Sequence, residues 1–258
     1  MVLIILGIIC AGPFFWILST SFKSGQNIYE LTLIPTHPTL ENYIGVVNFM
    51  YIPMYFLNTV IMTFFCILID VVFSSMCAYP LAKMEFYGKK IVNGALLSTM
   101  ILPAAAGMVV NYLTITNLHL IHSYLAVIVS SSVTVFSIIL LRQSYYSIPN
   151  EMLEAARIDG ASELKIWHKI MLPEVMPAVA TVIIFDFISK WNNFLWPIIV
   201  LNPEQYPLAA ALKFLGGQFA YNFGYIAAGT VISIIPTIVV FVIFQKYFIQ
   251  TLAGAIKG

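Results

Sequence analysis

Three ionisable residues stand inside long apolar stretches of this 258-residue chain, namely Asp70, Asp186 and Lys190. A charged side chain is costly within a lipid bilayer, so such residues usually pair with one another or line a pathway for a polar solute. Asp186 and Lys190 are four residues apart with the acid first, which is the favourable order for a pair on one helix. Two interpretations therefore stay open. One is an ion pair that holds helices together, with Asp70 able to meet Lys190 from another helix, and the other is the lining of a translocation path.

Residues 148–173 form the only long segment that is not apolar, and they lie between two hydrophobic stretches. A charged, helix-prone loop between apolar helices usually contacts something soluble. Glu154 and Arg157 are spaced to pair on a helix, and Gly160 suits a tight turn with positive φ. We expect short helices on both sides of this turn, the second from about 161 to 171, with Leu164 among its apolar contacts.

The order of residues within this segment is specific. It reads Glu154-Ala155-Ala156, three residues, Gly160, nine residues, Ile170, one residue and Leu172-Pro173. This pattern resembles the EAA loop of ABC importer permeases. The flanking stretches, such as Lys190-Trp191-Asn192, Phe194-Leu195-Trp196-Pro197 and the tail from Gly254 to Gly258, are similar to the maltose-type carbohydrate permeases. The resemblance covers roughly residue 13 to the end of the chain.

The resemblance implies an all-α membrane protein with six transmembrane helices and the type I ABC importer permease fold, in a single permease domain of residues 1–258. The loop 148–173 would be cytosolic and would dock on an ATPase subunit, whose closure on ATP moves the membrane helices as rigid bodies. The residues assigned to ATPase coupling are Glu154, Ala155, Ala156, Arg157, Asp159, Gly160, Ile170, Leu172 and Pro173. Gly254 and Lys257 match a tail that reaches the ATPase interface.

The same resemblance implies the permease subunit of an ATP-driven importer for a carbohydrate, more specifically an oligosaccharide. Its partners would be a second, related permease in a heterodimer, an ABC ATPase dimer and an extracytoplasmic solute-binding protein. The chain has no GxxxxGK[ST] sequence, so we expect ATP and Mg²⁺ on the partner ATPase, and no enzymatic activity or bound cofactor here. A glycerol-3-phosphate or other polyol permease is the alternative substrate class. An ion-coupled secondary transporter, with Asp70, Asp186 and Lys190 as coupling groups, is the alternative mechanism.

The fifth helix lines the cavity in this family, and its Trp-Asn-x-Phe stretch matches Trp191, Asn192 and Phe194. Trp191 and Trp196 are suited to stacking on a sugar ring, or else to anchoring the chain at the membrane interface. The residues predicted to line the path are Asn58, Asp70, Asp186, Lys190, Asn192, Asn193 and Trp196. The charges at 186 and 190 are unusual for the family, which leaves a charged sugar open.

Composition points to the same class of protein. Hydrophobic residues make up 60% of the chain and charged ones 9%, against about 25% charged in soluble domains. Mean hydropathy is +0.93, and a soluble fold this apolar would aggregate.

We predict membrane spans at roughly 1–22, 53–80, 90–113, 122–146, 174–200 and 224–248. Loops fill 23–52, with Pro35, Pro38 and Asn42 as breakers, and 201–223. Interruptions are expected at Pro103, Gly107, Pro197, Gly229 and Pro236.

Basic residues set the orientation in this topology. Those on one side are Lys83, Lys89, Lys90, Arg142, Arg157, Lys165, Lys169, Lys246 and Lys257, and only Lys23 and Lys213 fall on the other. The basic side is cytoplasmic. We therefore predict a multi-pass protein of the lipid bilayer of a bacterial or archaeal cytoplasmic membrane, with both termini in the cytoplasm. A net charge of +1 gives no reason to expect nucleic acid, and no Cys or His spacing indicates a metal site.

Overall fold

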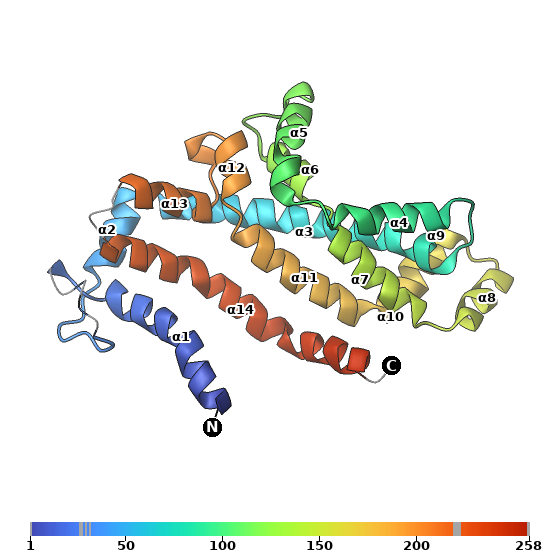
Figure 1. Cartoon of the computed structure of the whole chain (residues 1–258), viewed down its shortest axis with the longest axis horizontal. Helices are drawn as coiled ribbons and strands as arrows, with labels where there is room; N and C mark the ends of the chain where they lie inside the picture. Colours follow the sequence, from blue (N-terminus) through green and yellow to red (C-terminus); the bar gives the residue numbers. More distant parts are fainter. Residues whose placement is uncertain (1, 26–27, 29, 31, 219–222, 257–258) are drawn as a thin grey trace. The chain divides into compact units, whose positions relative to one another are not determined.

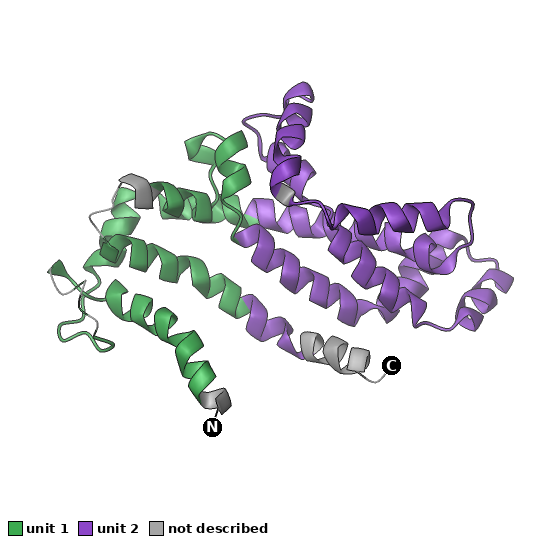
Figure 2. Cartoon of the chain, in the orientation of Figure 1, with its two compact units in different colours: residues 1–60, 192–239 green, residues 61–191, 240–258 purple. Residues whose placement is uncertain are grey.

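The computed structural model describes residues 2–256 apart from 26, 27, 29, 31 and 219–222, and every regular element in those residues is a helix (Figure 1). A helix satisfies its own backbone hydrogen bonds, which is what a chain of long apolar stretches needs in lipid. Two compact units divide the chain (Figure 2). Unit 1 comprises residues 1–60 and 192–239, and unit 2 comprises residues 61–191 and 240–258.

Unit 1 contains the N-terminal helices and the helices that follow residue 192. Its elements are α1 (Val2–Ser21), α2 (Glu41–Phe49), the start of α3 (Ile52–Lys83), α12 (Leu195–Val200), η3 (Pro203–Gln205), α13 (Leu208–Gln218) and the first half of α14 (Phe223–Ile256). The end of α1 is tied to α2 by Asn42, whose buried amide donates to the carbonyls of Ser21 (3.1 Å) and Lys23 (2.6 Å). These bonds satisfy carbonyls that a helix end leaves without a partner.

Helices α2 and α14 pack closely at a glycine. A Cβ atom at Gly45 would lie 2.4 Å from the ring of Tyr225, so any side chain there would push the tyrosine out of place. The beginning of α3 is fixed in a different way. The Asn58 amide donates to the carbonyls of Glu204 (3.1 Å) and Tyr206 (3.2 Å), and Thr59 Oγ1 accepts from the backbone N–H of Leu208 (2.7 Å). The segment before α13 is thereby held against α3.

Unit 2 contains the rest of α3 and the charged segment. Its other elements are α4 (Lys89–Thr99), α5 (Ala104–Asn117), α6 (Tyr124–Ser131), α7 (Val135–Tyr146), α8 (Asn150–Ile158), α9 (Glu163–Ile166), η2 (Trp167–Met171), α10 (Leu172–Glu174), α11 (Met176–Trp191) and the end of α14. The core of this unit is formed by α3, α7, the charged segment and α11, with Tyr79, Leu141, Tyr145, Trp167 and Val182 among its buried side chains. The charged segment is therefore part of the same packed core as the apolar helices around it.

Long apolar helices with exposed apolar faces identify this as a membrane fold. Phe64 on α3 is 59% exposed and Val109 on α5 is 67% exposed, which a soluble protein would avoid. Helix α3 and residues 223–246 of α14 are each long and apolar enough to cross a membrane. Two bent pairs raise the number of candidate spans in the described residues to four, α6 with α7 (43°) and residues 163–174 with α11 (78°). The predicted six spans stay a prediction.

Two helices were not predicted, because the segments that contain them were expected to be irregular loops. Helix α2 lies in the expected loop 23–52, and α13 lies in the expected loop 201–223. Asn42, expected to break helices, is in the first turn of α2, because its side chain is occupied with the carbonyls at the end of α1. An asparagine competes with a helix only when its amide bonds the local backbone.

The interruptions were predicted correctly at one position and wrongly at others. The third predicted span is divided between α4 and α5, with Pro103 immediately before α5, as expected. Pro197 lies inside α12, so the break in the fifth span falls earlier, at 192–194. Helix α14 continues through both Gly229 and Pro236, and Gly107 lies inside α5, so these interruptions were predicted wrongly. A single proline removes one backbone hydrogen bond, and a long transmembrane helix can accommodate that loss.

Candidate functional site

The charged segment folds as a helical hairpin, here named the hairpin, residues 148–173. Its first helix, α8, begins directly after Pro149. The turn at Gly160 has the predicted left-handed backbone, with φ of +75°. A Cβ at this position would meet nothing within 4 Å, so the constraint is conformational and not steric. Within unit 2, α8 lies at the end to which α3 and α7 run (Figure 1).

The second half of the hairpin differs from the single helix predicted for 161–171. It consists of α9, a π-helical turn (η2, Trp167–Met171) and the short α10. A π-turn holds one extra residue, is rare in proteins and is frequently found at functional sites. Here it accompanies a buried Trp167, while His168 and Lys169 stay exposed as predicted.

The nine predicted coupling residues divide between the core and the surface. Ala156 is buried, and Ile170 and Leu172 are half-buried. The exposed ones are Glu154, Ala155, Arg157, Asp159, Gly160 and Pro173. The predicted coupling residues therefore fall into two groups. The buried and half-buried ones pack the hairpin against its own unit, and the exposed ones are available to a partner.

Three large apolar residues that are exposed on the hairpin were not predicted as part of the site. Ile158 is 86% exposed, Leu164, expected to be an inner contact, is 63% exposed, and Met152 is 38% exposed. The inner contact of α8 is made by Leu153 and Ala156, which are buried. Large apolar side chains exposed among charges are typical of a surface that contacts another protein. For Ile158, its position off the face of Leu153 and Ala156 was the signal available in the sequence.

Three side chains of α3, spaced four residues apart, form hydrogen bonds to the hairpin: Ser75, Tyr79 and Lys83. Trp167 Nε1 donates to Ser75 Oγ (2.9 Å), and Ser75 Oγ shares a 2.6 Å hydrogen bond with the hydroxyl of Tyr145 on α7. Lys83 Nζ donates to Asn150 Oδ1 (2.8 Å) and to the carbonyl of Ile148. Buried polar groups of this kind fix one arrangement, because any other leaves a donor unpaired.

Glu163 accepts one hydrogen bond from α3 and one from the other half of the hairpin. The hydroxyl of Tyr79 donates to Oε2 (2.6 Å), and Arg157 Nε donates to Oε1 (2.8 Å). The Arg157 bond, with the Tyr79 bond second, lowers the pKa of the Glu163 carboxyl below its ordinary value. The predicted pairing of Glu154 with Arg157 is wrong, because Arg157 reaches across the Gly160 turn to Glu163.

The intramembrane charges form a second polar site, here named the Asp70 cluster: Asp70, Ser74, Thr134, Ser137, Asp186 and Lys190. Asp70 on α3 is fully buried and accepts four hydrogen bonds. Ser74 Oγ and the backbone N–H of Thr134 (3.0 Å) donate to Oδ1, while the hydroxyls of Thr134 (3.0 Å) and Ser137 (2.7 Å) donate to Oδ2. Asp70 thus ties α3 to the break between α6 and α7.

Asp186 and Lys190 pair along α11, as their spacing predicts. Lys190 Nζ lies 3.9 Å from Asp186 Oδ1, and both side chains are at least nine-tenths buried. Lys190 Nζ also donates to the carbonyl of Ser131, at the end of α6. Asp186 Oδ2 is buried and accepts no hydrogen bond from the described residues. This geometry favours the ion-pair interpretation for Asp186 and Lys190. The hydrogen-bond partners of Asp70 are hydroxyls and a backbone N–H, so the expected ion pair of Asp70 with Lys190 is not found among the described residues. The role of all three residues in the path stays a prediction.

The other predicted path residues belong to unit 1 and differ in exposure. Asn58 is buried with its amide on the carbonyls of Glu204 and Tyr206, and Trp196 is buried as well. Asn192 is exposed and Asn193 half-buried, in the turn that follows α11. In unit 2, the ring of Trp191 is stacked on Phe187, with centroids 5.1 Å apart.

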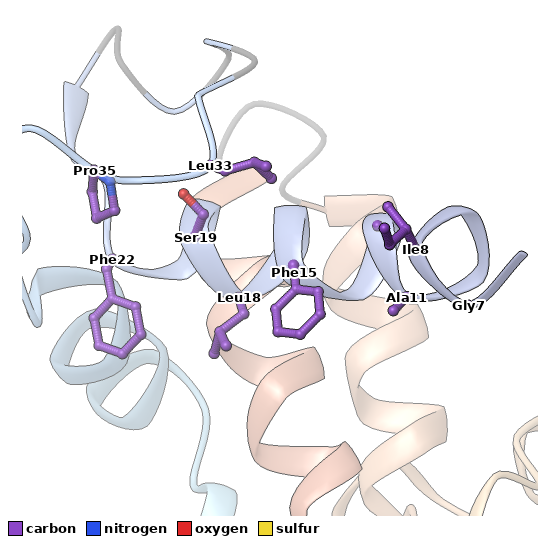
Figure 3. Close-up of a pocket in the computed structure, with 10 residues that line it drawn as sticks. Gly7, Ile8, Ala11, Phe15, Leu18, Ser19, Phe22, Leu33 and Pro35 are labelled. Carbon is purple, nitrogen blue, oxygen red and sulfur yellow. The ribbon is translucent and has the colours of Figure 1, made fainter. Parts of the chain in front are cut away.

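A cavity of about 640 Å³ lies in unit 1 along α1 (Figure 3). Its lining is almost entirely apolar and includes Gly7, Ala11, Phe15, Leu18 and Leu33. No predicted path residue lines it, and a sugar site needs convergent polar groups.

In the part of the chain that the structure describes, no three His, Cys, Asp or Glu residues are grouped as metal ligands would be. Of the predicted tail contacts, Gly254 lies in α14 and Lys257 lies outside the described residues.

Residues 46–254 match the family model described as "Binding-protein-dependent transport system inner membrane component". The chain belongs to this family. The match includes the whole hairpin and the Asp70 cluster. The resemblance predicted from the EAA-like spacing is confirmed, and with it the type I ABC importer permease fold.

Sugar permeases are among the relatives of this family member. The arabinooligosaccharides transport system permease protein AraQ of Bacillus subtilis is 34% identical over 95% of this chain and 90% of its own length. The melibiose/raffinose/stachyose import permease protein MelC of the same organism is 32% identical over 95% of this chain and 91% of its own. The trehalose/maltose transport system permease protein MalG of Thermococcus litoralis is 31% identical over 99% of this chain and 94% of its own length. The chain is thus a carbohydrate ABC importer permease.

Solved structures show the same fold. A chain of a bacterial ABC transporter involved in the import of the acidic polysaccharide alginate superposes with a TM-score of 0.84, at 29% identity, over 96% of this chain and 94% of its own length. A chain of the MetNI methionine ABC transporter superposes with a TM-score of 0.56 at 16% identity, over 78% of this chain and 94% of its own length. At this identity the likeness shows the fold alone.

Proposed function

We propose that this family member is the membrane-spanning subunit of an importer that takes up an oligosaccharide delivered by a solute-binding protein, driven by ATP hydrolysis on a separate subunit. The observation that carries the proposal is the hairpin, because its EAA-like residues and its two most exposed apolar side chains, Ile158 and Leu164, are available on its surface. An oligosaccharide is supported by relatives named for arabinooligosaccharides and for melibiose, raffinose and stachyose.

The hairpin acts by docking in a groove of the ATPase, through Glu154, Ala155, Arg157, Asp159, Gly160 and Pro173 on its surface, with Ala156, Ile170 and Leu172 packing it from within. Its movement must reach the membrane helices to have an effect. The hydrogen bonds from Ser75, Tyr79 and Lys83 to the hairpin provide that connection, because all three donors or acceptors stand on α3. A hairpin held only by apolar contacts could slide, whereas paired polar groups fix one position.

The remaining partners follow from the family. A second, related permease completes the translocation path as a heterodimer, and an ABC ATPase dimer binds ATP and Mg²⁺ on the cytoplasmic side. Both termini of this chain face that side, and the tail with Gly254 and Lys257 adds to the ATPase contact. Binding-protein delivery is supported by an alginate transporter structure that holds an alginate-pentasaccharide-bound periplasmic protein, although that chain shares only the fold with this one.

For the translocation path, the accessible side chains are better placed than the buried ones. Asn192 and Asn193 offer amides that can donate to and accept from sugar hydroxyls. Asn58 and Trp196 are buried and shape the surroundings from within unit 1. Asp70, Asp186 and Lys190 would contribute to the path only if helix movement opened their cluster.

Uptake by the reconstituted importer tests the proposal. The chain is co-expressed with its ATPase and second permease, and the purified complex is placed in liposomes with the cognate binding protein. We expect uptake of labelled oligosaccharide to require ATP and to survive an uncoupler. Uptake that follows an ion gradient and ignores ATP would favour secondary transport instead. A thermal-shift panel on the binding protein, with oligosaccharides and glycerol-3-phosphate, decides the substrate class.

The substitution Gly160→Asp tests the coupling role. Because the site is open and aspartate tolerates the left-handed region, the chain should still insert and fold. The new carboxylate should abolish co-purification of the ATPase and transport. Transport at the wild-type rate would contradict the coupling role assigned to the hairpin.

A further inference from the structure

Basic side chains gather where α4 begins, beside α7 in unit 2 (Figure 1). They are here named the basic patch: Lys89, Lys90 and Arg142. Arg142 Nη1 donates to Asn93 Oδ1, and the amide of Asn93 donates to the carbonyl of Lys89 (3.0 Å). Because Asn93 follows the two lysines by about one helical turn, the Arg142 guanidinium is held about one turn away from them.

The basic patch has more positive charge than its neighbours balance. Lys89 pairs with Glu85 (3.1 Å), but neither Lys90 nor Arg142 forms an ion pair among the described residues. Arg142 is half-buried, with its guanidinium carbon 5.6 Å from the centre of the Tyr146 ring, and its buried Nε has no acceptor among the described residues. A guanidinium has five N–H donors in a planar fork that fits a phosphate. An anion with several oxygen acceptors would therefore complete the patch.

The depth of the basic patch in the membrane matches a lipid phosphate. Lys83, just before α4, donates to Asn150 of the hairpin, so the patch lies at the end of unit 2 where the chain leaves the membrane. Four residues of helix, from Lys89 to Asn93, span about 6 Å. The polar headgroup layer on each side of the hydrocarbon core is about as thick. The Arg142 guanidinium is thus held at the level of the headgroups.

The surface next to the basic patch is suited to acyl chains. No residue of α4 is buried, so the described residues leave most of this helix uncovered. Ile91 is 75% exposed and Val92 is 42% exposed, directly after the two lysines. Tyr87 is fully exposed just before them, as is usual for an aromatic residue at a membrane interface. Cations above an exposed apolar surface are complementary to a lipid with an anionic headgroup.

From this geometry we infer that the basic patch is a binding site for an anionic phospholipid in the leaflet on the hairpin side. Arg142 and Lys90 hold the phosphate, and Ile91 and Val92 contact an acyl chain. The site joins α4 to α7 next to the hairpin. It requires only that the chain spans a membrane, and it is independent of which solute the importer carries.

Native mass spectrometry of the purified importer complex tests the inference, with phosphatidylglycerol as the anionic probe and phosphatidylcholine as the neutral one. We expect the wild type to retain phosphatidylglycerol preferentially. Lys90→Gln should weaken its apparent affinity about five-fold, the effect of removing one basic residue near an anionic lipid surface. The matched control is Lys213→Gln, which removes the same charge from an exposed residue of α13 in unit 1 and should bind phosphatidylglycerol as the wild type does. Equal losses in the two variants, or equal retention of the two lipids by the wild type, would overturn the inference.

Arg142→Gln should weaken phosphatidylglycerol binding more than Lys90→Gln does, because the planar fork can donate to two phosphate oxygens at once. Lys90→Gln decides the matter even if Arg142→Gln does not assemble, because Lys90 is exposed and forms no ion pair among the described residues. Inorganic phosphate at the same concentration should not displace phosphatidylglycerol. Displacement would overturn the inference, because the patch would then bind a free anion without need of the acyl chains.

Discussion

The hairpin and the Asp70 cluster both place charge in unit 2, but in opposite environments. Arg157 and Glu163 in the hairpin are each 42% exposed, whereas Asp70 is fully buried and the Asp186 side chain is 6% exposed. Exposed pairs contribute little to stability. A buried charge that lacks its partners strongly destabilises the fold. Substitutions should therefore affect stability in the cluster and partner binding on the hairpin.

The largest effect is expected from Asp70→Ala. This change leaves the Thr134 N–H and three hydroxyls without their acceptor, and unpaired buried donors cost on the order of 1–3 kcal/mol each when they cannot turn to a new partner. We expect the melting temperature and yield of the purified complex to fall sharply. Glu85→Ala, at an exposed carboxylate, should change neither. A stable Asp70→Ala complex would remove the contrast between the two regions.

Next comes Ile158→Glu on the hairpin. The residue is 86% exposed, so stability should change by about 0.5 kcal/mol or less. We expect Ile158 to be one of the few anchor residues of the interface, whose loss costs more than about 1 kcal/mol, so ATPase co-purification should fall at least several-fold. The matched control is Ile34→Glu, an isoleucine of similar exposure in the segment 23–52, where ATPase retention should be normal. Equal losses in the two variants would show that the effect is not specific to the hairpin.

A smaller effect is expected from Trp167→Phe, which tests the connection between the hairpin and α3. The change removes the donor to Ser75 and part of the buried ring, at a cost of about 1–2 kcal/mol. We expect ATP hydrolysis by the complex to continue while uptake per ATP falls. Measuring both rates in the same liposomes checks this. A proportional loss of hydrolysis and uptake would mean that the bond only stabilises the hairpin.

The smallest effect concerns pH. The folded-state pKa of Glu163 is lowered by Arg157 and then Tyr79, so the contribution of these bonds is present above the ordinary carboxyl pKa of about 4 and is lost as pH falls through the lower folded value. Protease cleavage in the hairpin should become faster in acid. Glu163→Gln should show fast cleavage already at neutral pH, with a weaker pH dependence. A wild-type hairpin that is equally resistant at all pH values would contradict this role of Glu163.

The hairpin was largely predictable because its signals are local. The EAA-like spacing, the proline before α8 and the left-handed turn at Gly160 each depend on neighbouring residues. The pairing of Asp186 with Lys190 was predictable for the same reason, since both stand on one helix. The exposure of Leu164 and the π-turn at Trp167 were not, because they depend on what packs beneath the hairpin.

The sequence by itself determined the class of protein, the apolar helices and the position of the hairpin, because composition and short-range spacing are sufficient for these. Only the tertiary structure decided the partners of the buried polar groups. Thr134 reaches Asp70 across 64 residues, Glu163 reaches Tyr79 across 84 and Trp167 reaches Ser75 across 92. Such contacts depend on which helix faces pack together, and no local pattern in the chain specifies that.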